Sequence, residues 1–123
     1  MRVNNEDLLN GQPLTLSTSQ NLKPIWLGHI ANYAIQLVFT GSPIGNFKLQ
    51  ACNDEADPRL PTSDLLTKLT HWTDIADSAQ AITASGDHMW TVENAGYTWV
   101  RVVWTQTGGT GTLTSARSYC KGV

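Results

Sequence analysis

The sequence predicts a small all-β protein, built as a sandwich or a barrel, and three observations support this. Apolar and polar side chains alternate along several short runs, as they do in half-buried strands. Thr, Val, Ile, Tyr and Trp recur in these runs, and such residues fit a pleated surface. Clusters of Gly, Pro, Asn and Ser separate the runs at short intervals. The 123 residues suffice for one domain, and no linker or low-complexity segment divides them.

The candidate strands follow one another along most of the chain. The clearest alternation lies in residues 32–40, where four large apolar side chains share one face: Tyr33, Ile35, Leu37 and Phe39. The returning run, 46–52, places Phe47, Leu49 and Ala51 on one face in the same way. By the same pattern we expect further strands at 14–19, 24–28, 72–75, 79–84, 88–92, 98–106 and 112–119.

Two segments of the chain share a similar order of residue types. Residues 36–40 end in Phe-Thr and precede a Gly-containing turn at 41–45. Residues 101–105 end in Trp-Thr and precede a Gly-rich turn at 107–111. We interpret the segments as two similar hairpins, which suits a pseudo-symmetric pair of packed sheets. The general sequence pattern of hairpins accounts for the similarity equally well.

One part of the chain departs from the strand pattern. Residues 53–61 are polar and bounded by Pro, which predicts a loop. At most one short helix is expected, near 62–70, with Ser63 as its N-cap. Three leucines stand there at helical spacing: Leu65, Leu66 and Leu69.

Composition excludes several classes of protein. Charged residues make up 15%, against about 25% in average proteins, which argues against intrinsic disorder. A net charge of −2 does not favour binding to nucleic acid. No apolar run is long enough to cross a membrane, and the first residues lack the pattern of a secretory signal. We therefore expect Cys52 and Cys120 to be buried thiols in a reducing cytosol, with one disulfide between them as the alternative.

No catalytic motif is present, so we expect no enzyme, no cofactor and no metal site. His29, His71 and His88 stand far apart in the sequence, and no nucleophile can be matched with a base. Asp54 and Asp57 lie in an acidic stretch that we interpret as a solvated loop. A structural Ca²⁺ site is the alternative, although the spacing of an EF-hand is missing.

Five tryptophans in so small a domain must largely fill its core: Trp26, Trp72, Trp90, Trp99 and Trp104. Along 98–105, the core face is expected to carry Val100, Val102 and Trp104, and the opposite face Trp99, Arg101 and Val103. We expect the Arg101 guanidinium to stack on Trp99. With Asp54 and Asp57, these two residues form the candidate binding surface. The alternative is a partly buried sheet face with a structural arginine.

Several of these motifs resemble those of small bacteriophage virion structural proteins. Residues 97–105, Tyr-Thr-Trp-Val-Arg-Val-Val-Trp-Thr, are similar to one of their strands, and 108–114 to the hairpin that follows it. The block at 36–54, the Trp-Thr-Asp-Ile motif at 72–75 and the closing Lys-Gly resemble further segments in the same order. Cys52 departs from the pattern, which usually has Ser there, and this points to a packing or pairing role for the thiol.

The resemblance implies a single-domain antiparallel β-sandwich of about eight strands, of the jelly-roll or galactose-binding-like (discoidin-like) kind. It implies a head decoration or cement protein, or a spike, fibre or tail-surface module, in a virion assembled in the host cytoplasm. The expected partners are the major capsid or tail proteins and copies of the chain itself, with a trimer favoured, and neither nucleic acid nor membrane. The family offers no catalytic residues.

The alternative function is a carbohydrate-binding module for host adsorption, with a surface glycan as partner. It predicts a flat, exposed tryptophan beside Asp, Asn or Arg at a loop end. A cement protein instead predicts oligomers and an extended arm. We assign that arm to residues 1–13 and the sandwich to 14–123, with Arg2, Val3, Leu8 and Leu9 as candidate assembly residues. Simple terminal disorder is the other interpretation of the arm.

Overall fold

The computed structural model describes residues 3–9, 11–28 and 30–122, and the regular structure in these ranges is almost entirely β. The predicted all-β fold with one short helix is confirmed. The elements in chain order are β1 (Val3–Asp7), β2 (Leu14–Thr15), β3 (Gln20–Asn21), β4 (Ile25–Trp26), β5 (Ile30–Cys52), α1 (Thr62–Lys68), β6 (Thr73–Asp74), β7 (Gln80–Ile82), β8 (Gly86–Val92) and β9 (Trp99–Gly122).

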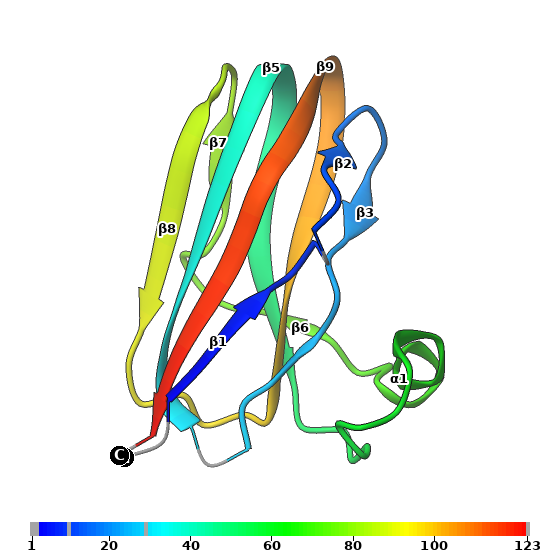
Figure 1. Cartoon of the computed structure of the whole chain (residues 1–123), viewed down its shortest axis with the longest axis vertical. Helices are drawn as coiled ribbons and strands as arrows, with labels where there is room; N and C mark the ends of the chain where they lie inside the picture. Colours follow the sequence, from blue (N-terminus) through cyan, green and yellow to red (C-terminus); the bar gives the residue numbers. More distant parts are fainter. Residues whose placement is uncertain (1–2, 10, 29, 123) are drawn as a thin grey trace.

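Two very long strands, β5 and β9, organise the whole molecule. They pair antiparallel along their full length, from Ile30 opposite Gly122 to Cys52 opposite Trp99. Both strands bend sharply at the same height, at the top of Figure 1. The bend divides one continuous hydrogen-bonded sheet into two layers that pack face to face.

Each layer is completed by shorter strands at its edges. In the first sheet the order is β1, residues 112–122 of β9, residues 30–40 of β5, and β8. In the second sheet β3 and β4 pair with the first half of β9, and β6 and β7 pair with the second half of β5. This antiparallel order, with the chain passing repeatedly between two sheets, is that of a jelly roll. The predicted sandwich is thereby confirmed in its jelly-roll form.

The corner between the two sheets depends on glycine. At Gly45, an added Cβ would lie only 2.1 Å from the carbonyl oxygen of Thr105 on the partner strand. At Gly109, φ is +64° and an added Cβ would lie 2.1 Å from the carbonyl oxygen of Ser42. The two backbones therefore approach each other at the bend more closely than residues with side chains allow.

The predicted hairpins at this corner are wrong. Residues 41–45 and 107–111 do not turn each chain segment back on itself but face each other across the bend. The two similar segments consequently pair with one another, so that Gln36 lies opposite Arg117 and Gln50 opposite Arg101. The two segments have a similar order of residue types because each must cross from one sheet to the other at the same corner.

The predicted core faces are confirmed. The side chains expected to point inward are nearly all below 5% exposed, and Ala51 is 9% exposed: Tyr33, Ile35, Leu37, Phe39, Phe47, Leu49, Val100, Val102 and Trp104. Phe47 and Trp104 are register partners, and their ring centroids lie 4.5 Å apart. The indole nitrogen of Trp104 donates to the carbonyl of Leu16 at 3.1 Å, which satisfies the one polar atom of that buried ring.

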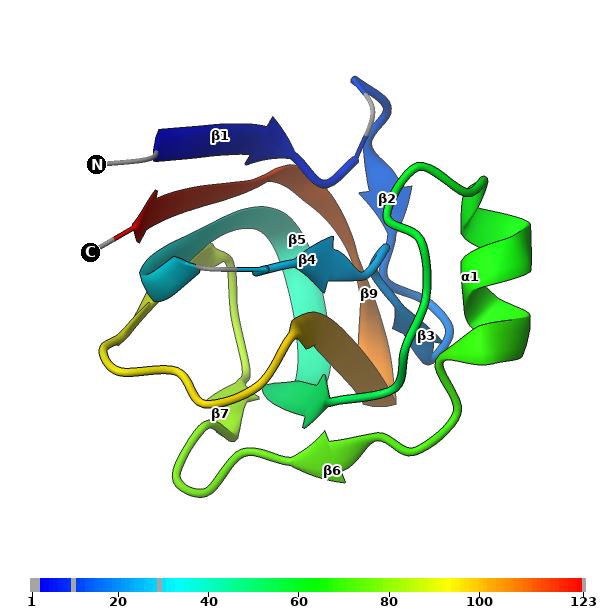
Figure 2. The same ribbon diagram turned by 90° about the horizontal axis from the view of Figure 1, so that it is seen from below.

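Residues 53–72 leave the sandwich and return to it; we call this segment the excursion. It contains α1, which stands beside the two sheets in Figure 2. Of the three leucines at helical spacing, Leu65 and Leu69 are buried, whereas Leu66 is exposed to solvent. Ser63 is not the N-cap, because the helix already begins at Thr62 and Pro61 occupies the N-cap position. Among the described residues, no helix is long and apolar enough to span a membrane.

Residues 3–7, near the start of the chain, are part of the sandwich. β1 pairs with β9 from Val3 opposite Lys121 to Asp7 opposite Arg117. Leu8 is 4% exposed within the core, and Leu9 packs against it. The structure thus pairs residues 3–7 with the first sheet, because β1 gains a ladder of backbone hydrogen bonds there. Arg2 lies outside the described residues, and a contact of Val3 or Leu9 with a neighbouring molecule stays a prediction.

Candidate functional site

Trp99 does not offer the exposed surface that its sequence position suggests. It lies on the outer face of the second sheet, but only 2% of it is exposed. The excursion covers it, and Trp99 packs with Cys52, Leu65 and Leu69 in a second apolar cluster. The excursion therefore converts part of an outer sheet face into a small core of its own.

Arg101 is held by its neighbours on the same outer face. Its Nε and Nη2 donate to Oε1 of Gln50 at 2.9 and 2.7 Å. Its guanidinium lies 4.3 Å from the ring centroid of Trp72, so the expected stacking on Trp99 is wrong and Trp72 is the partner. Gln50 in turn donates to Asp74 at 2.8 Å. This arrangement favours the interpretation of a structural arginine.

The two acidic residues of the candidate surface are engaged locally. Backbone amides of His71 and Thr70 donate to Asp54 at 2.8 Å and lower the pKa of its carboxyl group. Hydrogen bonds from the side chain and backbone of Arg59 lower the pKa of Asp57. Within the described residues, no three His, Cys, Asp or Glu side chains gather as a metal ion requires. Each carboxylate thus has partners within the excursion, and a binding role for Trp99, Arg101, Asp54 and Asp57 stays a prediction.

One group at the end of the excursion combines a hydroxyl, an imidazole and a carboxylate. Thr70 Oγ1 lies 3.2 Å from His71 Nδ1, and Asp54 Oδ1 lies 3.0 Å from the same nitrogen. A relay needs the acid on one ring nitrogen and the hydroxyl on the other. Because both partners contact Nδ1, and the His71 side chain is 84% exposed, this group lacks the geometry of a catalytic triad.

In the described part of the chain, His88 is half-buried and both cysteines are buried. The ring of His88 packs edge-on against Trp90 at 4.7 Å, and desolvation lowers the pKa of His88. Cys52 and Cys120 are buried, unbonded thiols in separate apolar clusters, and burial raises the pKa of both. A raised thiol pKa reduces the fraction of reactive thiolate. His29 lies outside the described residues.

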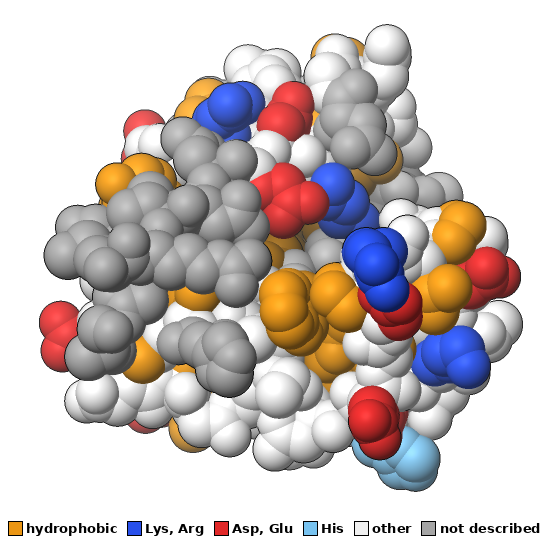
Figure 3. All heavy atoms as spheres, turned by 60° about the horizontal axis from the view of Figure 1, so that its bottom comes forward, with side chains coloured by type: hydrophobic (Ala, Val, Ile, Leu, Met, Phe, Trp, Pro, Cys, Tyr) orange, Lys and Arg blue, Asp and Glu red, His pale blue; other side chains and the backbone are white. Residues whose placement is uncertain are grey.

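A cleft of about 260 Å³ opens at the lower end of the molecule in Figure 1, opposite the corner, and we call it the base cleft. Its sides come from β1 and the residues before β4, and from the excursion. Orange hydrophobic side chains gather in this region in Figure 3, bordered by blue and red ones. The lining residues are Glu6, Lys23, Pro24, Trp26, Pro58, Leu60, Thr62, Leu65 and Trp99.

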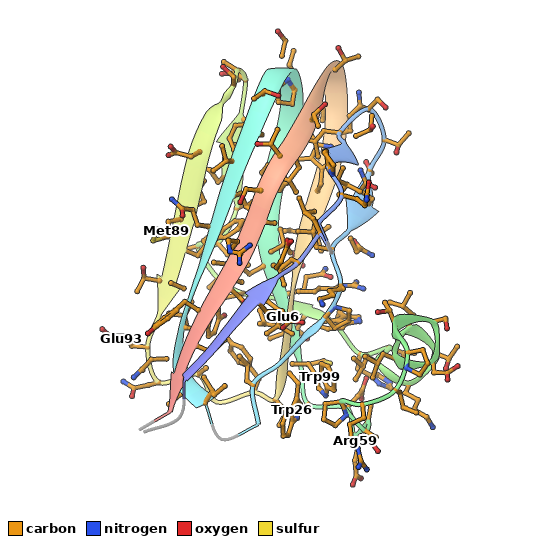
Figure 4. The ribbon with its side chains drawn as sticks, viewed as in Figure 1. Glu6, Trp26, Arg59, Met89, Glu93 and Trp99 are labelled. Carbon is orange, nitrogen blue, oxygen red and sulfur yellow. The ribbon has the colours of Figure 1, made fainter. Side chains whose placement is uncertain are left out.

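Two shallow hollows lie on the outer face of the first sheet. They share Ala34 and Tyr119, and Met89 borders one of them. Met89 is 51% and Tyr119 43% exposed, and with Ala34 they line an exposed surface on this face. In Figure 4, Met89 and Glu93 mark the β8 side of this face. We call Ala34, Met89 and Tyr119 the outer patch.

Sequence reasoning missed both surfaces. Glu6, Trp26 and Leu60 are far apart in the chain, and only the fold brings them together. A signal for the outer patch was present, since Ala34 and Tyr119 fall at outward positions of alternating runs. Together with Met89 they place apolar side chains on a solvent-facing surface.

Comparison with known proteins supports the fold. No family model and no curated protein matches this chain. Among solved structures, the SPBc2 prophage-derived protein YomS is similar, with a TM-score of 0.54 and 11% identity over 97% of this chain and 92% of that one. Matches with a TM-score of 0.48 include tripeptidyl peptidase 2, at 15% identity over 92% of this chain and 9% of that one. Another is a structure of infectious bursal disease virus, Gx strain, at 12% identity over 97% of this chain and 32% of that one.

Proposed function

We propose that this chain is a non-enzymatic structural protein of a bacteriophage particle, displayed on its head or tail surface. The observation that carries the proposal is the similarity in fold to the prophage-derived YomS, which extends over nearly the whole of both chains. The sequence motifs that resemble small virion proteins support it independently. The virion is the location we propose, and capsid or tail proteins are the proposed partners.

The build of the molecule suits this role. Both sheets share the two strands β5 and β9, so the layers cannot separate without breaking a continuous hydrogen-bonded ladder. A particle-surface protein needs such a rigid body, because its function is to present fixed surfaces to many identical neighbours. Weak contacts repeated over a lattice then provide strong attachment.

We assign the outer patch to contact with a second copy of the chain. Its apolar centre, with Met89 and Tyr119, is flanked by acidic Asp87 and Glu93 on the β8 side and by Arg117 on the β9 side. Symmetric packing brings the β8 side of one copy against the β9 side of the next. The acidic side chains of one copy then lie close to Arg117 of its neighbour, around the apolar centre. In a closed ring such as a trimer, every copy makes the same contacts with its neighbours.

The first measurement is mass spectrometry and electron imaging of particles purified from cells that produce this chain during phage growth. We expect the chain in the particles at a fixed ratio to the major capsid or tail protein, with matching density on the surface. Its absence from purified particles would contradict the proposal directly.

The same experiment tests the outer patch with paired variants. Met89→Glu places a charge in the patch, and we expect it to reduce occupancy on the particle at least about tenfold, since a buried unpaired charge costs several kcal/mol. Leu66→Glu is the matched control, because Leu66 is 49% exposed on α1, away from the patch. Equal occupancy of both variants would show that attachment to the particle does not need a contact through the outer patch.

A further inference from the structure

Trp26 and Trp99 form an aromatic floor beneath the base cleft. They are register partners on β4 and β9, so their side chains share the outer face of the second sheet. The excursion buries Trp99 but leaves Trp26 half-buried at the cleft. Figure 4 shows the two tryptophans close together at the base, with Glu6 above them and Arg59 beyond.

The ring of Trp26 is held in place by the backbone behind it. An added Cβ at Gly28 would lie 2.8 Å from Cζ2 of Trp26, so the indole rests directly on the glycine. Gly28 has φ +53°, a conformation that glycine adopts without strain. A ring fixed in this way loses little conformational entropy when a ligand stacks on it.

A charged pair stands at the edge of the same floor. Lys23 Nζ lies 2.7 Å from Glu6 Oε1, and the two side chains remain 24% and 31% exposed. Together they offer a carboxylate acceptor and an ammonium donor side by side. Two adjacent hydroxyl groups match this pair, one donating to Glu6 and the other accepting from Lys23.

We propose that the base cleft binds a neutral hexose unit of a surface glycan, with the apolar face of the sugar on Trp26 and two adjacent hydroxyls on Glu6 and Lys23. The charges around the cleft favour a neutral ligand, because Glu6 is matched by Lys23 and the nearby Asp57 by Arg59. The volume of about 260 Å³ is small for a ligand site and suits a single sugar ring.

This assignment does not depend on the proposed place in a particle. It gives the carbohydrate-binding alternative a location, and that location differs from the Trp99–Arg101 surface expected from the sequence. A single sugar unit on one tryptophan binds weakly, with a Kd on the order of 1 mM or above. Many copies on one particle would raise the effective affinity for a cell surface.

The test is a titration of the ¹⁵N-labelled protein with the methyl glycosides of glucose, galactose and mannose, up to about 50 mM. We expect at least one sugar to shift the indole resonance of Trp26 and the amides of the cleft. In Trp26→Ala these amide shifts should disappear. Glu6→Gln should weaken binding about five- to tenfold, because the amide replaces a charge-assisted hydrogen bond with a weaker one.

Ile44→Ala is the matched control, since it removes an exposed apolar side chain at the corner between the two sheets, away from the cleft and the outer patch. It should bind the sugar as the unchanged protein does. The amide spectrum of each variant verifies its fold, and Glu6→Gln keeps the test decisive if Trp26→Ala does not fold. Absence of shifts with all three sugars, or shifts that persist in the cleft variants, would overturn the assignment.

Discussion

Replacing Gly45 with alanine should prevent this protein from folding or cost about 3 kcal/mol or more in the free energy of unfolding. The new Cβ would lie 2.1 Å from the carbonyl oxygen of Thr105 and 2.9 Å from the ring of Trp104. Neither neighbour has room to move, because Thr105 is backbone inside the β5–β9 ladder and Trp104 is fully buried. Denaturant unfolding followed by circular dichroism measures the loss.

Gly108→Ala is the matched control for that variant. Gly108 belongs to the same corner, but a Cβ there would meet only Ile44 at 4.0 Å, and its φ is not in the left-handed region. We expect its free energy of unfolding to change by less than about 1 kcal/mol. If both variants are equally stable, the two strands do not cross at this corner as described.

Trp104→Ala should cost about 3–5 kcal/mol, which is a large share of the total stability of a small domain. The side chain is fully buried, and its ring packs at a tilt against Phe47 on the neighbouring strand. Its removal leaves a cavity and deprives the Leu16 carbonyl of its hydrogen-bond donor. Thermal and denaturant unfolding curves should both move in the destabilising direction.

Two further variants separate the effects of packing and of hydrogen bonding. Trp104→Phe keeps a ring against Phe47 but lacks the donor, so its cost should be smaller, about 1–2 kcal/mol. Trp26→Ala, at the half-buried edge of the sandwich, should also cost less than Trp104→Ala. A Trp104→Ala variant as stable as Trp26→Ala would show that Trp104 does not lie in the core.

Alternation was sufficient to predict the inward faces of residues 32–40, 46–52 and 98–105. Residues such as Ile35 and Val102 follow a period of two, and this period alone determines which side of a strand is buried. The same signal predicted that β5 and β9 exist, but not that each continues through its glycines. Gly41 and Gly111 look like hairpin turns in sequence, whereas their pairing across the corner is a long-range contact that no local pattern encodes.

The binding surfaces were less predictable for a related reason. Trp99 has the spacing of an outward residue, and it does point outward, but the excursion folds over it. Arg101 was expected beside an aromatic ring, and Trp72 supplies that ring from a distant part of the chain. Long-range packing decides which outward residues remain accessible. The base cleft forms because residues 58–65 of the excursion lie beside β1 and β4.

Backbone nuclear Overhauser effects between β5 and β9 test the central structural claim most directly. The claim is that one pair of strands builds both sheets and so positions the outer patch and the base cleft. We predict cross-strand signals between Gln36 and Arg117 on one side of the corner and between Gln50 and Arg101 on the other. Signals joining Thr40 to Asn46, as in a local hairpin, in place of those long-range signals would contradict it.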